Sequence, residues 1–132
     1  MMHDSAYDAL NQILESDSSI RFAGLVDGNG RLILHGCRSG IVPLLSPGEA
    51  ETSVVQAVLK MGTEKVFEEK LGRIEYVLTV YPKVKRVTVP LREPDLFLLI
   101  SIEASCDHEK VMREKVFPAL RSSQFREAIE SH

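Results

Sequence analysis

The chain has 132 residues, a formal net charge of −3 and an apolar fraction of 44%. These values are typical of one globular domain, so we expect residues 1–132 to fold as a single unit. The sequence has no long basic run, which argues against nucleic acid as a partner. Its longest purely apolar stretch, Leu96–Ile100, is far shorter than a membrane span.

The amino-terminal stretch MMHDSAYDAL has neither a basic start nor an apolar run, so it does not resemble a secretory signal. Cys37 and Cys106 are the only cysteines, which is too few for a disulfide framework. We therefore expect a cytoplasmic protein.

The first part of the chain predicts a helix followed by a β-hairpin. Residues 5–16 place apolar side chains at helical spacing, and Ser5 can cap the first turn. Residues 20–26 and 31–36 alternate in polarity as strands do, and four turn-forming residues separate them. We expect these two strands to pair in an antiparallel hairpin.

A loop and a long helix come next. Residues 38–48 contain two prolines and two glycines together with apolar side chains, so we expect the loop to press against the core or a partner. Residues 49–70 have a broad apolar face and an acidic first turn, which indicates the longest helix.

Three strands and a final helix complete the prediction. The strands cover residues 73–81, 84–91 and 96–103, and the last of them is apolar on both faces, which favours a central position. The helix covers residues 107–129, with a kink expected at Pro118. The order of elements predicts an α+β domain with a single five-stranded antiparallel sheet flanked by helices.

The Asp27-Gly28-Asn29-Gly30 stretch raises the question of a phosphate or metal site. A phosphate loop leads from a strand into a helix, whereas this stretch leads into another strand. A calcium loop needs more oxygen ligands than Asp27 and Asn29 supply. We therefore interpret the stretch as a hairpin turn, since Asp, Asn and Gly tolerate the required backbone angles.

Two pairs of potential zinc ligands follow predicted strands: His35 with Cys37, and Cys106 with His108. Structural zinc ligands are usually spaced two to four residues apart, whereas one residue separates each of these pairs. The sequence also lacks a G-x-S-x-G motif and a serine beside a histidine and an acid, and the Cys37–His35 pair has no third group to orient it. We expect no catalytic, cofactor-binding or metal-binding residue, and hence no enzyme.

The hairpin IRFAGLVDGNGRLI, the long helix and the stretch RIEYVLTVYPKVKRVTVPLREPDLFLLISIE resemble the roadblock/LC7 domain. That family is grouped with profilin-like and longin-like folds, and the resemblance covers residues 5–125. It implies a non-enzymatic homodimer or heterodimer that binds or regulates a small GTPase or tethers a larger protein complex. Similar chains occur in archaea, and an archaeal origin would fit the resemblance.

A dimer is also expected from the sequence itself. The order of elements places strand 73–81 at a sheet edge, and Ile74–Tyr81 carries only one charge, Glu75. Soluble proteins usually protect such an edge, so an unprotected one favours pairing with a second copy. With the long helices packing beside the joined strands, as the resemblance implies, the expected interface consists of Val55, Leu59, Met61, Phe67, Ile74, Tyr76, Val77, Thr79 and Tyr81.

The alternative function is a small-molecule sensor of the PAS or GAF kind, which also wraps helices around a five-stranded sheet. That alternative predicts a cavity lined by residues such as Phe22, Tyr76 and Phe97. The scaffold function predicts a filled core and a dimer with a joined sheet. If the dimer forms through the strand 73–81, Val77→Lys or Thr79→Lys is expected to give monomers.

Overall fold

A computed structural model describes residues 2–91 and 95–130, with side chains from residue 5 onward. Its centre is one five-stranded sheet in the order β2-β1-β5-β4-β3, and every neighbouring pair is antiparallel. The α+β prediction is therefore confirmed, as is the central position of the last strand. The strands are β1 Ile20–Asp27, β2 Leu32–Cys37, β3 Val77–Val80, β4 Val84–Pro90 and β5 Leu96–Glu103.

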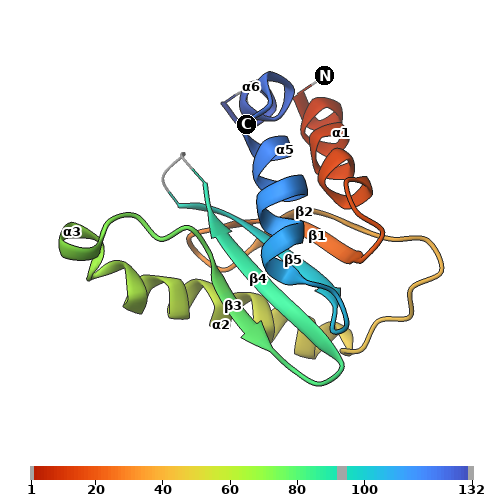
Figure 1. Cartoon of the computed structure of the whole chain (residues 1–132), viewed down its shortest axis with the longest axis horizontal. Coiled ribbons are helices and arrows are strands. Elements are labelled where there is room, and N and C mark those ends of the chain that lie inside the picture. The colour runs from red at the N-terminus through yellow and green to blue at the C-terminus, as the bar shows by residue number, and fades with distance from the viewer. Residues whose placement is uncertain (1, 92–94, 131–132) are drawn as a thin grey trace.

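One face of the sheet is covered by the amino-terminal and carboxyl-terminal helices together (Figure 1). Helix α1, Met2–Glu15, packs against β1, β2 and α6. It contributes Ala9, Leu10 and Ile13 to the main core, and all three are buried. The strands contribute the alternate residues that point to this face, such as Leu98 and Ile100.

The predicted carboxyl-terminal helix is interrupted. It consists of α4 His108–Val111, the π-helical turn η1 Met112–Val116, α5 Phe117–Arg121 and α6 Ser123–Glu130. The expected irregularity near Pro118 is therefore present, as a π-helical turn just before the proline. A second break lies at Ser122, whose backbone is extended.

The opposite face of the sheet carries a single long helix, α2, Pro47–Lys65 (Figure 1). Ser46 caps it in a capping box with Glu49. The short helix α3, Glu68–Leu71, follows after a break that neither glycine nor proline marks. Gly72, with a φ of 93°, ends α3, whereas the long helix predicted over residues 49–70 already ends at Lys65.

The predicted strand 73–81 is shorter than expected, because only Val77–Val80 pairs with β4. The backbone N–H of Ile74 donates to Glu68 Oε2 at 2.8 Å, so this residue is tied to α3 rather than to a neighbouring strand. The edge position of the strand is confirmed, since β3 ends the strand order.

The stretch from Asp27 to Gly30 is a turn, as the sequence predicts. Asp27 Oδ1 accepts hydrogen bonds from the N–H groups of Asn29 and Arg31, at 2.9 Å and 3.0 Å. Gly30 has a φ of 81°, and a Cβ there would come within 3.0 Å of Val55 on α2. Glycine is therefore required both for the turn and for its contact with α2. Among the residues the structure describes, no helix is long and apolar enough to cross a membrane.

Candidate functional site

The edge of the sheet at β3 has backbone groups with no neighbouring strand. Tyr81 N–H donates to Val84 O, and hydrogen-bonded pairs alternate along an antiparallel ladder. The N–H and C=O groups of Leu78 and Val80 therefore point away from β4. Val80 is also 60% exposed. This edge, Val77–Val80, can accept a further strand without losing any bond to β4.

Helix α2 crosses the sheet obliquely and reaches this edge with its carboxyl-terminal half. Its Val55 touches the turn between β1 and β2 at Gly30. Further along, Lys60 Nζ donates to Thr79 Oγ1 on β3 at 3.2 Å. Beyond that point the helix continues past the strand, and α3 lies clear of the sheet (Figure 1).

The apolar side chains of α2 divide into a buried and an exposed set. Val54 and Met61 are buried against the sheet, with Ala57 and Val58 partly buried beside them. Val55, Leu59 and Val66 lie on the next face of the helix and are exposed. The sequence predicts one broad apolar face here, whereas only part of that face is covered by the chain itself.

Met61 does not fit the interface predicted from the sequence. It is fully buried between α2 and the sheet, at 0% exposure, so its side chain offers nothing to a partner. Val55 lies beside Gly30, away from the β3 edge. Leu59, Phe67 and Tyr81 are exposed, as an interface requires.

The other predicted interface residues, Ile74, Tyr76, Val77 and Thr79, are half-buried. Strand alternation over residues 73–81 would place Ile74 and Tyr76 on one face, but they lie on opposite sides because regular pairing begins only at Val77. Ile74 packs with the α2 cluster, whereas Tyr76 packs on the opposite side against Phe117. Val77 and Thr79 face α2, so lysine at either position would disturb the helix packing as well as the edge.

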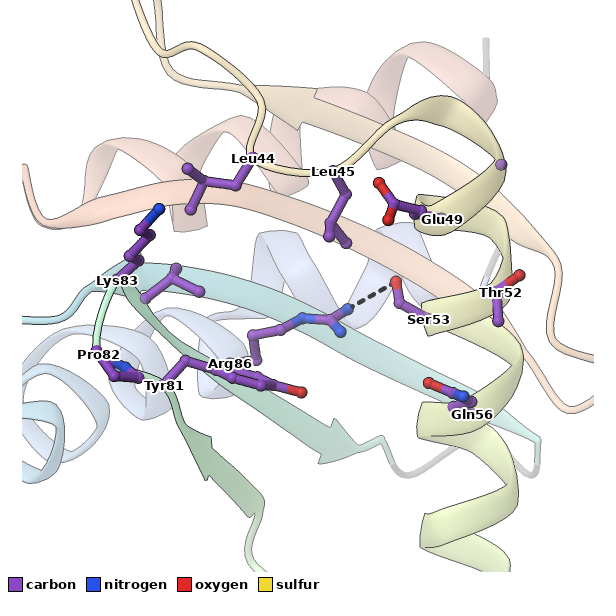
Figure 2. A pocket seen from close by; sticks show the side chains of 12 residues that line it. Leu44, Leu45, Glu49, Thr52, Ser53, Gln56, Tyr81, Pro82, Lys83 and Arg86 are labelled. Carbon is purple, nitrogen blue, oxygen red and sulfur yellow. Dashed lines mark hydrogen bonds between the residues drawn. The ribbon is translucent and has the colours of Figure 1, made fainter.

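A cavity of about 720 Å³ opens on the half of the α2-side face that α2 leaves uncovered (Figure 2). Leu44 and Leu45 close it from the 38–48 loop, and Tyr81 with Pro82 closes it from the β3–β4 hairpin. The loop was expected to press against the core or a partner. Its Val42, Leu44 and Leu45 are all exposed in the single chain, so it is not part of the core.

Arg86 is the central polar group of this cavity (Figure 2). Its guanidinium donates one hydrogen bond, to Ser53 Oγ at 3.1 Å. Burial lowers the pKa of Arg86 from its ordinary value, and the electrostatic effect of Tyr81 partly opposes this. The side chain stays charged at neutral pH, because an arginine pKa lies so far above it. In the described residues, the ion pairs are Arg21–Glu103 and Arg113–Glu109, so Arg86 lacks a carboxylate.

Sequence reasoning missed Arg86 because a charged side chain on the predicted strand 84–91 is most simply interpreted as a surface residue. Lys85 fits that interpretation in part, since its side chain points to the other face and donates to the Cys106 carbonyl at 2.7 Å. The available signal was the alternation along β4, which places Arg86 with Val84 and Thr88 on the α2 side. Val66 and Leu71, both highly exposed, were also missed.

The two histidines among the candidate zinc ligands contact other residues. β2 and β5 do flank β1 and run parallel, as that hypothesis requires. His35 stacks on Phe22 with ring centroids 5.9 Å apart, and His108 Nδ1 lies 3.4 Å from Lys85 Nζ. Within the described part of the chain, no three His, Cys, Asp or Glu side chains come together as a metal site.

The sensor alternative predicts a cavity lined by Phe22, Tyr76 and Phe97 together. Tyr76 alone of the three lines a smaller pocket of about 460 Å³, beside Val77. None of the three lines the cavity of about 720 Å³. Phe97 is buried under α2, with Lys65 Nζ 5.2 Å from its ring centroid. Tyr76 packs on the other face of the sheet.

Comparison with solved structures gives close matches over nearly the whole chain. The gliding protein MglB of Thermus thermophilus matches with a TM-score of 0.77 at 16% identity, covering 99% of this chain and 93% of that one. A Roadblock/LC7 domain from Streptomyces avermitilis has a TM-score of 0.65 at 10% identity, covering 86% and 90%. The chain has the roadblock/LC7-like fold.

MglC of Myxococcus xanthus shares this roadblock/LC7-like fold, with a TM-score of 0.61 at 15% identity over 97% of this chain and 99% of that one. An MglB structure described as a tetrameric arrangement also matches. No protein-family model and no curated protein matches the sequence. The resemblance to roadblock/LC7 domains is confirmed at the level of the fold, and the archaeal origin and cytoplasmic location stay predictions.

Proposed function

We propose that the protein is a non-enzymatic, dimeric regulatory or scaffold module of the roadblock/LC7 type, which binds a small GTPase or a larger protein complex. The observation that carries this proposal is the open edge at Val77–Val80, beside which α2 and α3 leave large apolar side chains in solvent. The tetrameric arrangement described for MglB supports self-association.

In the proposed dimer, the two β3 strands pair antiparallel across a two-fold axis. The outward groups of Leu78 and Val80 then bond to the same residues of the second copy, and the two sheets become one. Leu59 and Phe67 lose their exposure to water in the same step. The paired helices and the joined sheet form a composite surface for the protein partner, which is the arrangement that the resemblance implies.

The polar groups of the cavity favour binding over catalysis. Ser53 Oγ donates to Ala50 O at 2.7 Å and accepts from Arg86. Its proton is therefore already committed, and neither a histidine nor a carboxylate is hydrogen-bonded to it. Activating a serine requires a neighbouring base.

The sharpest test of the dimer removes one edge N–H group. Val80→Pro deletes an outward N–H that makes no bond to β4, so the monomer is expected to keep its fold. His35→Pro is the matched control on the other edge strand, β2. Arg38 N–H donates to Arg21 O, and because hydrogen-bonded pairs alternate along the ladder, the His35 N–H points away from β1. Light scattering after size exclusion is expected to give a monomer for Val80→Pro and a dimer for His35→Pro. The reverse result would assign the interface to β2, and two unchanged dimers would reject strand pairing.

The partner is tested with the same variant. Immobilised wild-type protein is exposed to lysate of the source organism, supplemented with GDP or a non-hydrolysable GTP analogue. We expect a small GTPase, or the subunits of one complex, to be retained by the wild type and lost with Val80→Pro. Retention of neither class would contradict the proposed role, and equal retention by the monomeric variant would show that the composite surface is not needed.

A further inference from the structure

Helix α3 projects from the molecule (Figure 1), and its apolar side chain and that of the residue before it are exposed. Phe67 is 58% exposed and Leu71 is 82% exposed, and α3 has no buried residue. Single exposed apolar side chains are common, but two of this size on one projecting turn indicate a binding element. Glu69, on the opposite side of the same turn, is also exposed.

The cavity described above offers the opposite chemistry. It is walled by Leu44, Leu45 and Tyr81, and each of them is partly exposed. Arg86 lies inside it with a single hydrogen bond, to Ser53. Glu49 supplies a carboxylate among the residues that line the cavity. This carboxylate accepts a hydrogen bond from the Ser46 backbone N–H instead, at 2.9 Å. Burying a guanidinium without a carboxylate is costly, so the cavity fits an apolar group that carries a negative charge.

Strand β3 connects these two features, because α3 lies at its start and the cavity at its end. The bond between Glu68 and the Ile74 N–H ties α3 to the segment that leads into β3. Tyr81 and Pro82, directly after β3, line the cavity. Antiparallel pairing of two β3 strands brings the start of one strand beside the end of the other. Each α3 is thereby carried to the cavity of the other copy.

We propose that α3 of each copy docks into the cavity of the second copy, between the loop and the sheet, with Phe67 and Leu71 against Leu44 and Leu45 and with Glu69, on the opposite side of the turn, paired to Arg86 on β4. This inference rests on the proposed dimer and adds a second contact to it. Each cavity is completed only by the partner chain, and the contact occurs twice in a two-fold dimer. Leu44 and Leu45 of the exposed loop then become part of the interface.

The apolar part of the contact is tested with Leu71→Ser, a change at a side chain too exposed to affect the fold of the monomer. Val42→Ser is the control, since Val42 is 76% exposed but does not line the cavity. Analytical ultracentrifugation is expected to show a dimer dissociation constant at least tenfold higher for Leu71→Ser and unchanged for Val42→Ser. Equal values for Leu71→Ser and the wild type would overturn the docking of α3.

The charged part is tested by exchange. Arg86→Glu and Glu69→Arg each place like charges together in the proposed contact, and each is expected to weaken the dimer at least tenfold. The double variant restores an opposite pair and is expected to recover most of the affinity. Absence of recovery, with both single variants folded by circular dichroism, would overturn the pairing. If Arg86→Glu does not fold, Arg86→Met combined with Glu69→Ala gives the coupling from a double-mutant cycle, and a coupling of zero would overturn it.

Failure of this inference is separable from failure of the dimer. If Val80→Pro gives a monomer but Leu71→Ser and the charge exchange leave the dimer unchanged, the strands pair and α3 does not dock. If the wild type is itself a monomer at every concentration, the proposed dimer and the docking of α3 both fail.

Discussion

The two faces of the sheet differ in how completely the chain covers them. On the face covered by α1 and the carboxyl-terminal helices, buried residues from the helices and from β1, β4 and β5 form one continuous core. On the α2 face the buried cluster is small, with Val54 and Met61 against three strand residues. A large cavity and several exposed apolar side chains lie on that side.

This difference separates stability from binding. Burial of apolar area supplies most of the free energy of folding, so the first face holds the molecule together. The α2 face leaves apolar area exposed and keeps Arg86 without a carboxylate, which costs stability in the single chain. Covering this face with a partner would recover free energy. The proposed dimer, the docking of α3 and the cavity all lie on this second face or at its edge.

The largest expected loss of unfolding free energy comes from truncating two adjacent leucines on β5, which compares the packing of the two faces of the sheet. Leu98 and Leu99 are 0% and 2% exposed but point to opposite faces. We expect Leu98→Ala to lower the free energy of unfolding by about 4 kcal/mol and Leu99→Ala by about 2 kcal/mol, because α2 can shift to close part of the void. Urea denaturation measures both, in the Val80→Pro background to exclude dimer effects. Equal losses would mean that the two faces are equally well packed.

Two half-buried arginines give the next comparison. Arg38 donates to the backbone carbonyls of Ile20, Leu14 and Asp17, so it joins α1 to the sheet. Arg38→Met would leave these carbonyls unpaired and is expected to cost about 2–3 kcal/mol of unfolding free energy. Arg86→Met removes one hydrogen bond, which destabilises the fold, and also removes the desolvation cost of the half-buried charge, which stabilises it. The free energy of unfolding is therefore expected to change by no more than about 0.5 kcal/mol.

The same denaturation experiment in the monomeric background compares these two variants. A large loss for Arg86→Met would show that this arginine stabilises the single chain, and would weaken the case that its cavity awaits a partner. A small loss for Arg38→Met would show that the first face depends on apolar packing alone.

The fold could be predicted from the sequence because the strands carry strong local patterns. Residues 96–103 are apolar on both faces, which only a central strand explains, and the structure places β5 there with the same bounds. The Asp27–Gly30 turn follows from backbone angles that few residues tolerate. These signals are local, so no knowledge of tertiary contacts is needed to interpret them.

The site could be predicted only in part, because burial depends on the angle at which elements cross. The periodicity of α2 gives an apolar face but does not say which part the sheet covers, and so Met61 was assigned to the interface although it is core. Arg86 appears as a surface charge until β4 is paired and α2 is placed over it. The predicted dimer interface itself stays a prediction.

Helix caps on the two faces are expected to give a smaller and nearly equal effect. Ser46 Oγ accepts from the Glu49 N–H at 3.2 Å at the start of α2, and Ser122 Oγ accepts from the Phe125 N–H at 3.2 Å at the start of α6. Each serine-to-alanine change is expected to cost about 1 kcal/mol of unfolding free energy. A negligible cost for Ser46→Ala alone would mean that α2 is held loosely enough to fray without affecting the rest of the fold.

The smallest effect concerns pH and belongs to the covered face. Hydrogen bonds from the side chain and then from the backbone N–H of Ser19 lower the pKa of Asp17, with burial opposing them. A carboxyl group whose pKa is lower in the folded state stabilises the protein above its unfolded pKa, and that contribution disappears as the pH falls through the folded pKa. Because Asp17 is partly exposed, we expect Asp17→Asn to cost only about 0.5 kcal/mol at pH 7. The cost is expected to shrink toward zero as the pH falls through the folded pKa of Asp17, because the wild-type carboxyl is then also protonated. Denaturation curves at a series of pH values from 7 downward test this, and a cost that does not change with pH would show that the Ser19 contacts act through the shape of the turn rather than through the charge.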